Sequence, residues 1–235
     1  MKKNITYILL LLTLMIFPIN GIFAYRRANT DEYKEFLRGF LEGKYYINKD
    51  EEVETGPSTM SKTGKEVVDK LNEIALTEAE DPHEGGYKYW SWFGFSYRDE
   101  WCAMFVSWLF TQVDGIDKYI IKSAAATYIA RYSTQNGYST WHEDECTDPS
   151  TVPQPGDVIL FDPWENGAYT PYPHHWNEKF YSSHIGYVYD VDDTYVYTVE
   201  GNSGDRLRKK QYDRKTHCGN IGSQQGINGY LRPNY

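Results

Sequence analysis

The sequence is poor in cysteine, with only three in 235 residues. No two of them have the short spacing of a zinc finger, so a structural zinc site is not expected. An HExxH motif is also missing, which argues against a zinc hydrolase even though three histidines fall between positions 174 and 184. The sequence therefore predicts a protein without metal or other cofactor.

Positive charge is also scarce, since 24 Lys and Arg face 33 Asp and Glu and give a net charge of −9. Nucleic-acid binding depends on neutralising phosphates with basic side chains, so no nucleic-acid partner is expected. The basic run at 206–215 could attract anionic polymers, but a solvated strand or loop is the preferred interpretation.

Long hydrophobic runs are missing except at the N-terminus. Lys2 and Lys3 precede an apolar stretch from Ile8 to Phe17, and Ala24 offers a small residue for cleavage. This order is typical of a secretory signal peptide, predicted over residues 1–24, with an uncleaved anchor as the alternative. The stretch is short for a bilayer span, so we expect secretion without stable membrane insertion after cleavage.

The remaining chain divides into a charged extension, 25–60, with a short amphipathic helix, and a main domain, 61–235. The extension either docks on the main domain or acts as a pro-segment. Apolar spacing in the main domain predicts helices over 64–79, from about 100 to 112, and over about 117–133. Period-two alternation predicts strands near 157–162, 184–191 and 195–200 and near the C-terminus. Helices followed by strands predict an α+β domain with an antiparallel sheet.

Cys102 lies in the segment YRDEWCAMFVSWLF, residues 97–110. With Asp99 as the N-cap, Cys102 would stand in the first helical turn, where free N–H groups and the helix dipole favour a thiolate. A cysteine in an apolar helix is more often inert core. The nucleophile hypothesis therefore needs a base nearby.

The segment SHIGYVYDVDDTYVYTVEGNSGD, residues 183–205, supplies that base. A three-residue loop at 192–194 pairs Tyr187 with Val199, and it gathers the apolar residues on one face. This register sets His184 opposite Asn202, with Glu200 as its diagonal neighbour and Gly186 leaving space for the carboxylate. An imidazole, a carboxylate and an amide would then stand together. A hairpin with a polar, solvated face is the alternative.

These segments, with GGYKYWSWFGFSYRDEWCAMFVSW and PQPGDVILFD, resemble the CHAP family of cysteine, histidine-dependent amidohydrolases/peptidases over about residues 61–235. The resemblance implies a papain-like fold, with N-terminal helices packed on a small antiparallel β-sheet. It also implies that Cys102 is the nucleophile, His184 the base, Glu200 the third catalytic member and Asn202 an assisting polar residue.

The resemblance further implies a hydrolase that cleaves amide bonds of peptidoglycan, as an endopeptidase or an N-acetylmuramoyl-L-alanine amidase. With the signal peptide, we expect a secreted enzyme, and we expect it to be a monomer. Its partner would be peptidoglycan or its peptide stems. A catalytically silent wall-binding module and an acyl transferase with the same triad are the alternatives.

Two features set this sequence apart from the family pattern. Ser183 precedes the histidine, where an acidic or small polar residue is common, and a long loop rich in aromatics and histidine separates Asp162 from Ser183. We expect the loop to line the substrate groove. Export favours pairing of two cysteines, so a Cys146–Cys218 disulfide is also predicted, closing 218 − 146 = 72 residues and contributing roughly 4 kcal/mol.

Overall fold

The computed structural model describes residues 64–162, 180, 182–217 and 225–235, all of which belong to the unit Tyr46–Tyr235. The predicted signal peptide, the extension at 25–60 and most of the loop at 162–183 lie outside the described residues. Cys218 does too, so the Cys146–Cys218 disulfide stays a prediction. No helix in the described part of the chain is long and apolar enough to cross a membrane.

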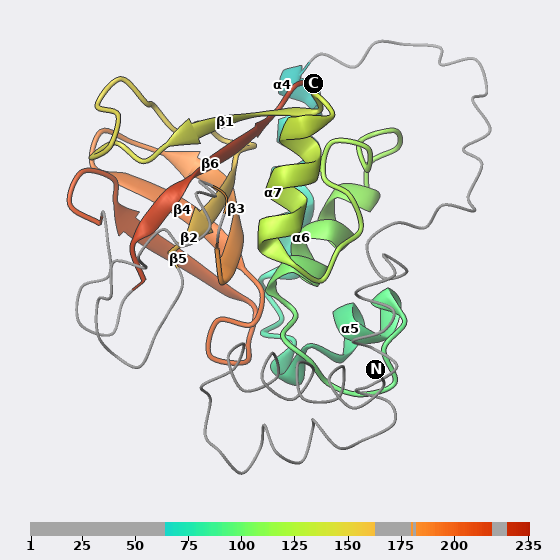
Figure 1. Cartoon of the computed structure of the whole chain (residues 1–235). Helices are drawn as coiled ribbons and strands as arrows, with labels where there is room; N and C mark the ends of the chain where they lie inside the picture. The colour runs from blue at the N-terminus through green and yellow to red at the C-terminus, as the bar shows by residue number, and fades with distance from the viewer. Residues whose placement is uncertain (1–63, 163–179, 181, 218–224) are drawn as a thin grey trace, which may run out of the picture. The chain divides into compact units, whose positions relative to one another are not determined.

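The helices come first along the described chain and lie together on one side of the sheet (Figure 1). They are α4 (Gly64–Glu78), the short 3-10 helix η1 (Glu84–Gly86), α5 (Tyr87–Phe93), α6 (Cys102–Thr111) and α7 (Ala126–Gln135). Within α6, all nine side chains from Cys102 to Phe110 are buried, so the helix is enclosed on every side. A helix that is apolar all round belongs in the centre of a core, and the other helices pack around α6 against the sheet.

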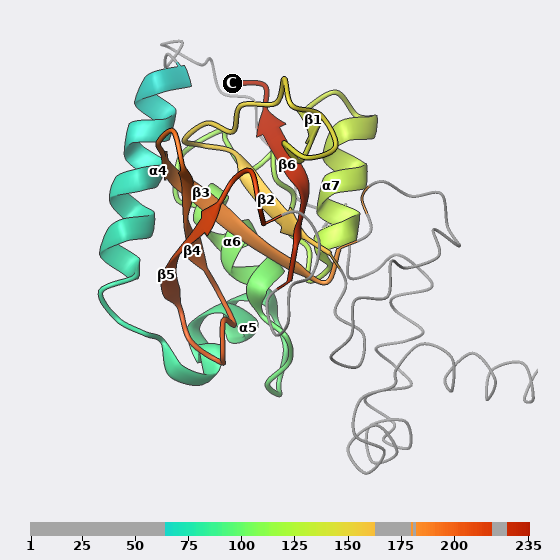
Figure 2. The same ribbon diagram turned by 90° about the vertical axis from the view of Figure 1, so that its left-hand side faces the viewer.

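Six antiparallel strands form one sheet in the order β1-β6-β2-β3-β4-β5 (Figures 1 and 2). The strands are β1 (Ser139–Glu143), β2 (Val158–Phe161), β3 (His184–Val191), β4 (Tyr195–Glu200), β5 (Arg208–Asp213) and β6 (Ile227–Pro233). Both faces are partly buried. The side chains of Val158 and Leu160 join the core beneath the helices, whereas Ile159 and Phe161 join a second cluster on the opposite face. The predicted α+β architecture with an antiparallel sheet is confirmed.

The third predicted helix begins later than expected, at Ala126 and not near 117. The buried Ser107 hydroxyl donates to the carbonyls of Ile121 and Ser123, at 3.0 and 3.1 Å, and accepts from the Ser123 N–H. These bonds use backbone groups that a helix would pair internally, so the chain stays irregular up to the extended N-cap Ala125.

The predicted hairpin register is right near the site and wrong near the turn. Tyr187 pairs with Val199 as expected, but an irregularity between Val188 and Asp190 sets Val191 opposite Val196. A β-bulge adds one unpaired residue, so the two ends of the hairpin differ in register. The error does not reach the predicted site residues, which lie beyond Tyr187 and Val199.

Candidate active site

Cys102 is the first residue of α6, and its thiol is free and buried, with 7% exposed. The predicted N-cap, Asp99, is wrong, because the cap position belongs to Trp101, whose side chain makes no capping hydrogen bond. Asp99 accepts a hydrogen bond from the neighbouring Glu100 N–H instead. The first intrahelical bond runs from Phe105 N–H to the Trp101 carbonyl, so the N–H groups just before Phe105 have no partner within the helix.

Trp101 fixes the position of Cys102, because its fully buried indole is enclosed on several sides. The ring stacks on Tyr89 with a centroid separation of 5.1 Å. A Cβ atom on Gly86 would come within 2.3 Å of the indole, and one on Gly201 within 2.9 Å. Two glycines therefore allow close backbone approach to the residue that precedes Cys102.

His184 begins β3, and its imidazole lies between the carboxylate of Glu200 and the thiol of Cys102. Its Nε2 is 2.9 Å from Glu200 Oε2, and the ring lies close enough to Cys102 for the thiol to help raise the pKa of the imidazole. Since Nε2 is engaged by the carboxylate, Nδ1 is the nitrogen left for sulfur. Only 15% of the His184 side chain is exposed.

Glu200 ends β4 and is 1% exposed. Besides His184, it accepts hydrogen bonds at Oε1 from the Thr198 hydroxyl, at 2.6 Å, and from the Tyr212 hydroxyl, at 2.7 Å. Buried carboxylates are tolerated where such donors and an opposite charge compensate for lost hydration.

The electrostatics favour a charged pair of His184 and Glu200. Burial lowers the pKa of His184, but its hydrogen bonds to Cys102 and Glu200, and the negative charge of these groups, outweigh burial and raise that pKa from 6.5 to about 10. For Glu200, burial favours the neutral acid, but the bonds from His184, Thr198 and Tyr212 leave its pKa below the ordinary value. At neutral pH the site thus holds an imidazolium beside a carboxylate.

Gly186 creates the space that the carboxylate occupies. A Cβ atom at this position would lie 2.7 Å from Glu200 Cγ and 3.3 Å from Ile159 Cγ2. The predicted need for a glycine opposite Glu200 thus agrees with the structure.

Asn202 is the predicted residue that the structure does not bring to His184. Its backbone has a positive φ of 58°, and its side-chain amide donates to the Glu100 carboxylate. Cys102, His184 and Glu200 are brought together, while Asn202 lies against the segment that leads into α6.

Other polar groups have structural partners. Asp157 is buried and paired with Arg232, at 2.9 and 2.8 Å, and burial raises its pKa. Ser183 lies beside Gln225, whose amide donates to its hydroxyl at 2.7 Å. In the described ranges no group of three or more potential ligands could hold a metal ion. A hollow of about 650 Å³ beside α4 and the C-terminus contains none of the three site residues.

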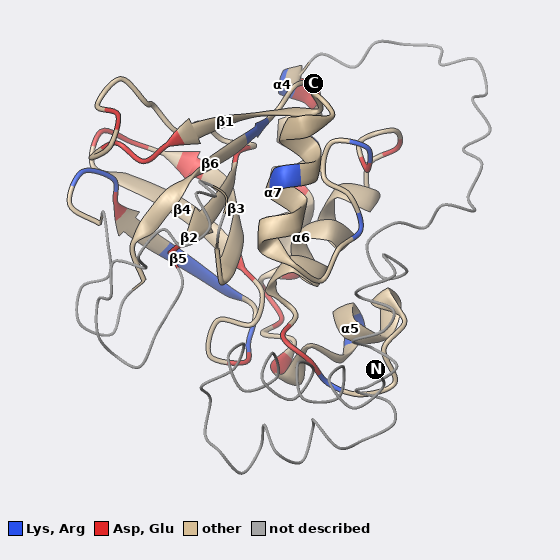
Figure 3. Ribbon diagram, in the orientation of Figure 1, with Lys and Arg blue, Asp and Glu red and all other residues tan. Residues whose placement is uncertain are grey.

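The sequence interpretation missed Thr198 and Tyr212, both of which bond to Glu200. Thr198 could have been found from its position two residues before Glu200, on the same face of β4. Tyr212 could not, because the basic run was interpreted as a solvated strand or loop without a pairing register. In the structure the basic run forms the edge strand β5 (Figure 3). This strand pairs with β4 and sets Tyr212 opposite Val196.

Residues 92–202 match the family model of the CHAP domain, a narrower range than the resemblance at 61–235. Two similar solved structures are "The crystal structure of Ly7917" and "The crystal structure of Ly7917 with the hydrolyzing product of MDP". Both are 16% identical to this chain, with TM-scores of 0.41 and 0.38, and cover 71% and 69% of it. The match spans 62% of each of those chains, less than two thirds of their length. No curated protein matches the sequence.

The family match confirms the predicted resemblance. The matched range includes all four predicted site residues, from Cys102 to Asn202.

Proposed function

We propose, from the premise that residues 92–202 are a CHAP domain, that this chain is a secreted cysteine hydrolase of peptidoglycan amide bonds. The observation that carries the proposal is the continuous contact from the Cys102 thiol through the His184 ring to the buried Glu200 carboxylate. A nucleophile, a base and an orienting acid in this order are the parts of a thiol hydrolase. We also propose the papain-like arrangement, signal cleavage after residue 24 and a monomeric state.

The first step is attack by the Cys102 thiolate on the carbonyl carbon of an amide. The carbonyl π electrons move to oxygen, and the resulting oxyanion is stabilised by N–H groups at the uncapped start of α6. Collapse of this intermediate breaks the C–N bond, and the His184 imidazolium donates its proton to the departing amine. The products of this half-reaction are a free amine and a thioester on Cys102.

The second step is hydrolysis of the thioester. Neutral His184 takes a proton from water as the oxygen attacks the thioester carbonyl. The C–S bond then breaks, and the acid product leaves while the thiolate–imidazolium pair is restored. Glu200 holds one orientation of the ring throughout and stabilises its charged form, because its Oε2 stays on Nε2.

Mass spectrometry of fragments released from purified peptidoglycan tests the proposal, with Cys102→Ala as the matched control. Fragments that require Cys102 support the hydrolase, and their new termini separate an endopeptidase from an amidase. Products carrying an added amine instead of water would indicate the acyl transferase. Folded protein that sediments with the wall but releases nothing would overturn hydrolysis and indicate a binding module.

A further inference from the structure

Both oxygens of the Glu200 carboxylate have assigned partners. Oε2 faces His184, at 2.9 Å, while Oε1 accepts from the hydroxyls of Thr198 and Tyr212, at 2.6 and 2.7 Å. Thr198 is fully buried and Tyr212 is 8% exposed, so water competes little for these bonds. Rotation of the carboxylate would break at least one of them. The two hydroxyls thus determine where Oε2 points.

Tyr212 is a donor that keeps its proton over the working pH range. Burial, and then the negative charge of Glu200, raise the pKa of this phenol well above its ordinary value of 10. The Thr198 hydroxyl does not titrate. Hydrogen bonds from both favour the ionised carboxylate, and they help to keep the pKa of Glu200 low in spite of burial.

The ring of Tyr212 is itself fixed by aromatic neighbours. Its centroid lies 4.9 Å from that of Phe161 and 4.9 Å from that of His217. Phe161 in turn contacts the His184 ring, at 5.5 Å. His217 is anchored by a 2.7 Å contact between its Nε2 and the Gln225 carbonyl. The strand pairing of β4 with β5 therefore carries Tyr212 into a rigid aromatic group beside the base.

We propose that Tyr212, together with Thr198, is a positioning residue of the site, which keeps Glu200 ionised and aimed at His184. The proposal rests on the proposed function, in which His184 must be charged beside the Cys102 thiolate. Neither residue touches the substrate in this role. Both act through the carboxylate, so their loss changes the pH at which the site becomes active.

The test is the pH dependence of Cys102 alkylation by iodoacetamide in the full chain, with the labelled peptide quantified by mass spectrometry. Tyr212→Phe removes only the hydroxyl and raises the pKa of Glu200. A protonated Glu200 no longer supports the imidazolium, so less thiolate forms at acid pH. We expect the acid midpoint of alkylation to rise by about one to two pH units, because a hydrogen bond to a charged group is lost.

Tyr197→Phe is the matched control. Its hydroxyl also donates to a carboxylate, Asp192 Oδ2 at 2.7 Å, but this pair is exposed and lies at the hairpin turn. We expect its acid midpoint to equal that of the wild type. A Tyr212→Phe protein that is folded by circular dichroism and has an unmoved midpoint would overturn the proposal.

Substitutions of Thr198 test the same proposal independently, in case the Tyr212→Phe protein does not fold. Thr198→Val should raise the acid midpoint in the same direction, and Thr198→Ser, which retains the donor, should restore it. A midpoint equally moved in both variants would mean that packing and not the hydrogen bond matters, and would overturn the proposal. Alkylation needs no peptidoglycan, so wild-type protein that releases no wall fragments defeats the proposed function without affecting this readout.

Discussion

Replacing Gly186 with alanine tests whether the space opposite Glu200 is required. The new Cβ would lie 2.7 Å from Glu200 Cγ, about 1 Å short of an ordinary carbon–carbon contact. Ile159 Cγ2, at 3.3 Å, blocks retreat on another side. Overpacking of this kind costs about 1–3 kcal/mol of unfolding free energy.

The effect on activity follows from the direction in which Glu200 can move. Thr198 and Tyr212 hold Oε1, so displacement of Cγ separates Oε2 from His184. Loss of a hydrogen bond to a charged group costs about 1.5–3 kcal/mol. If the transition state loses that amount, the rate falls roughly 10- to 100-fold, since about 1.4 kcal/mol is a factor of ten.

Initial rates of fragment release from peptidoglycan, beside thermal unfolding, measure both effects. Gly64→Ala is the matched control, because its Cβ would lie at an ordinary 3.5 Å from Tyr235 Cβ, in a hollow that contains none of the three site residues. We expect that variant to retain wild-type activity. A Gly186→Ala protein that is folded and as fast as wild type would refute the reasoning that Glu200 must occupy this space.

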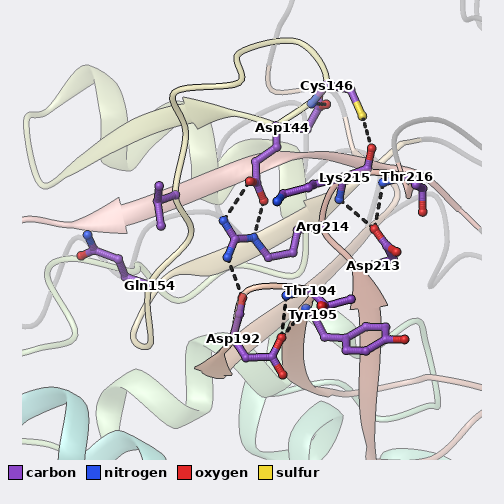
Figure 4. Close-up of polar contacts among 12 residues, drawn as sticks. Asp144, Cys146, Gln154, Asp192, Thr194, Tyr195, Asp213, Arg214, Lys215 and Thr216 are labelled. Carbon is purple, nitrogen blue, oxygen red and sulfur yellow. Dashed lines mark hydrogen bonds and ion pairs between the residues drawn. The ribbon is translucent and has the colours of Figure 1, made fainter.

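Three further perturbations have expected outcomes. The pKa of His184 in the folded state is raised from 6.5 to about 10, so the imidazolium contributes fully to the free energy of unfolding below pH 6.5, and this contribution is lost as the pH rises towards 10. Urea unfolding measured between these two pH values should show the loss. His184→Gln should make the free energy of unfolding less dependent on pH over the same range. Arg214 and Glu145 form a buried bidentate pair, at 2.5 and 2.8 Å. Arg214 also donates to the Asp192 carbonyl, at 2.6 Å (Figure 4). Glu145→Ala should cost about 3–5 kcal/mol of unfolding free energy, because an unpaired cation stays buried, and a loss below 1 kcal/mol in urea unfolding would contradict this. Trp101→Ala removes a fully buried indole and should cost about 3–5 kcal/mol, which differential scanning calorimetry can check.

The sequence predicted the parts of the site that depend on local patterns. The apolar alternation of 183–200 indicated the pairing of Tyr187 with Val199, and that pairing places Glu200 near His184 whatever happens at the turn. The irregularity between Val188 and Asp190 was not predictable, because no residue type in either strand marks the position of a bulge. Helix α6 was expected, since its uninterrupted apolar run can only be central.

The errors occur where tertiary hydrogen bonds override local preference. The segment before Ala126 has helical spacing, yet the Ser107 hydroxyl holds its backbone groups from another helix. Asp99 has the residue type of an N-cap, but its carboxylate bonds to Glu100 and leaves the helix end to Trp101. Propensity at one position cannot reveal a partner that comes from a distant segment.

The start of α6 and the Glu200 carboxylate differ in how completely their polar groups are hydrogen-bonded. At the start of α6 the Trp101 side chain makes no capping hydrogen bond, and the N–H groups before Phe105 have no partner within the helix; in the proposed mechanism they stabilise the oxyanion. At Glu200 every oxygen is engaged beforehand, so the base has one orientation before substrate arrives. A capped helix would compete with the oxyanion, and a loosely held carboxylate would let the ring turn. The proposed mechanism uses both features, since it needs N–H groups for the oxyanion and a carboxylate that holds the ring in one orientation.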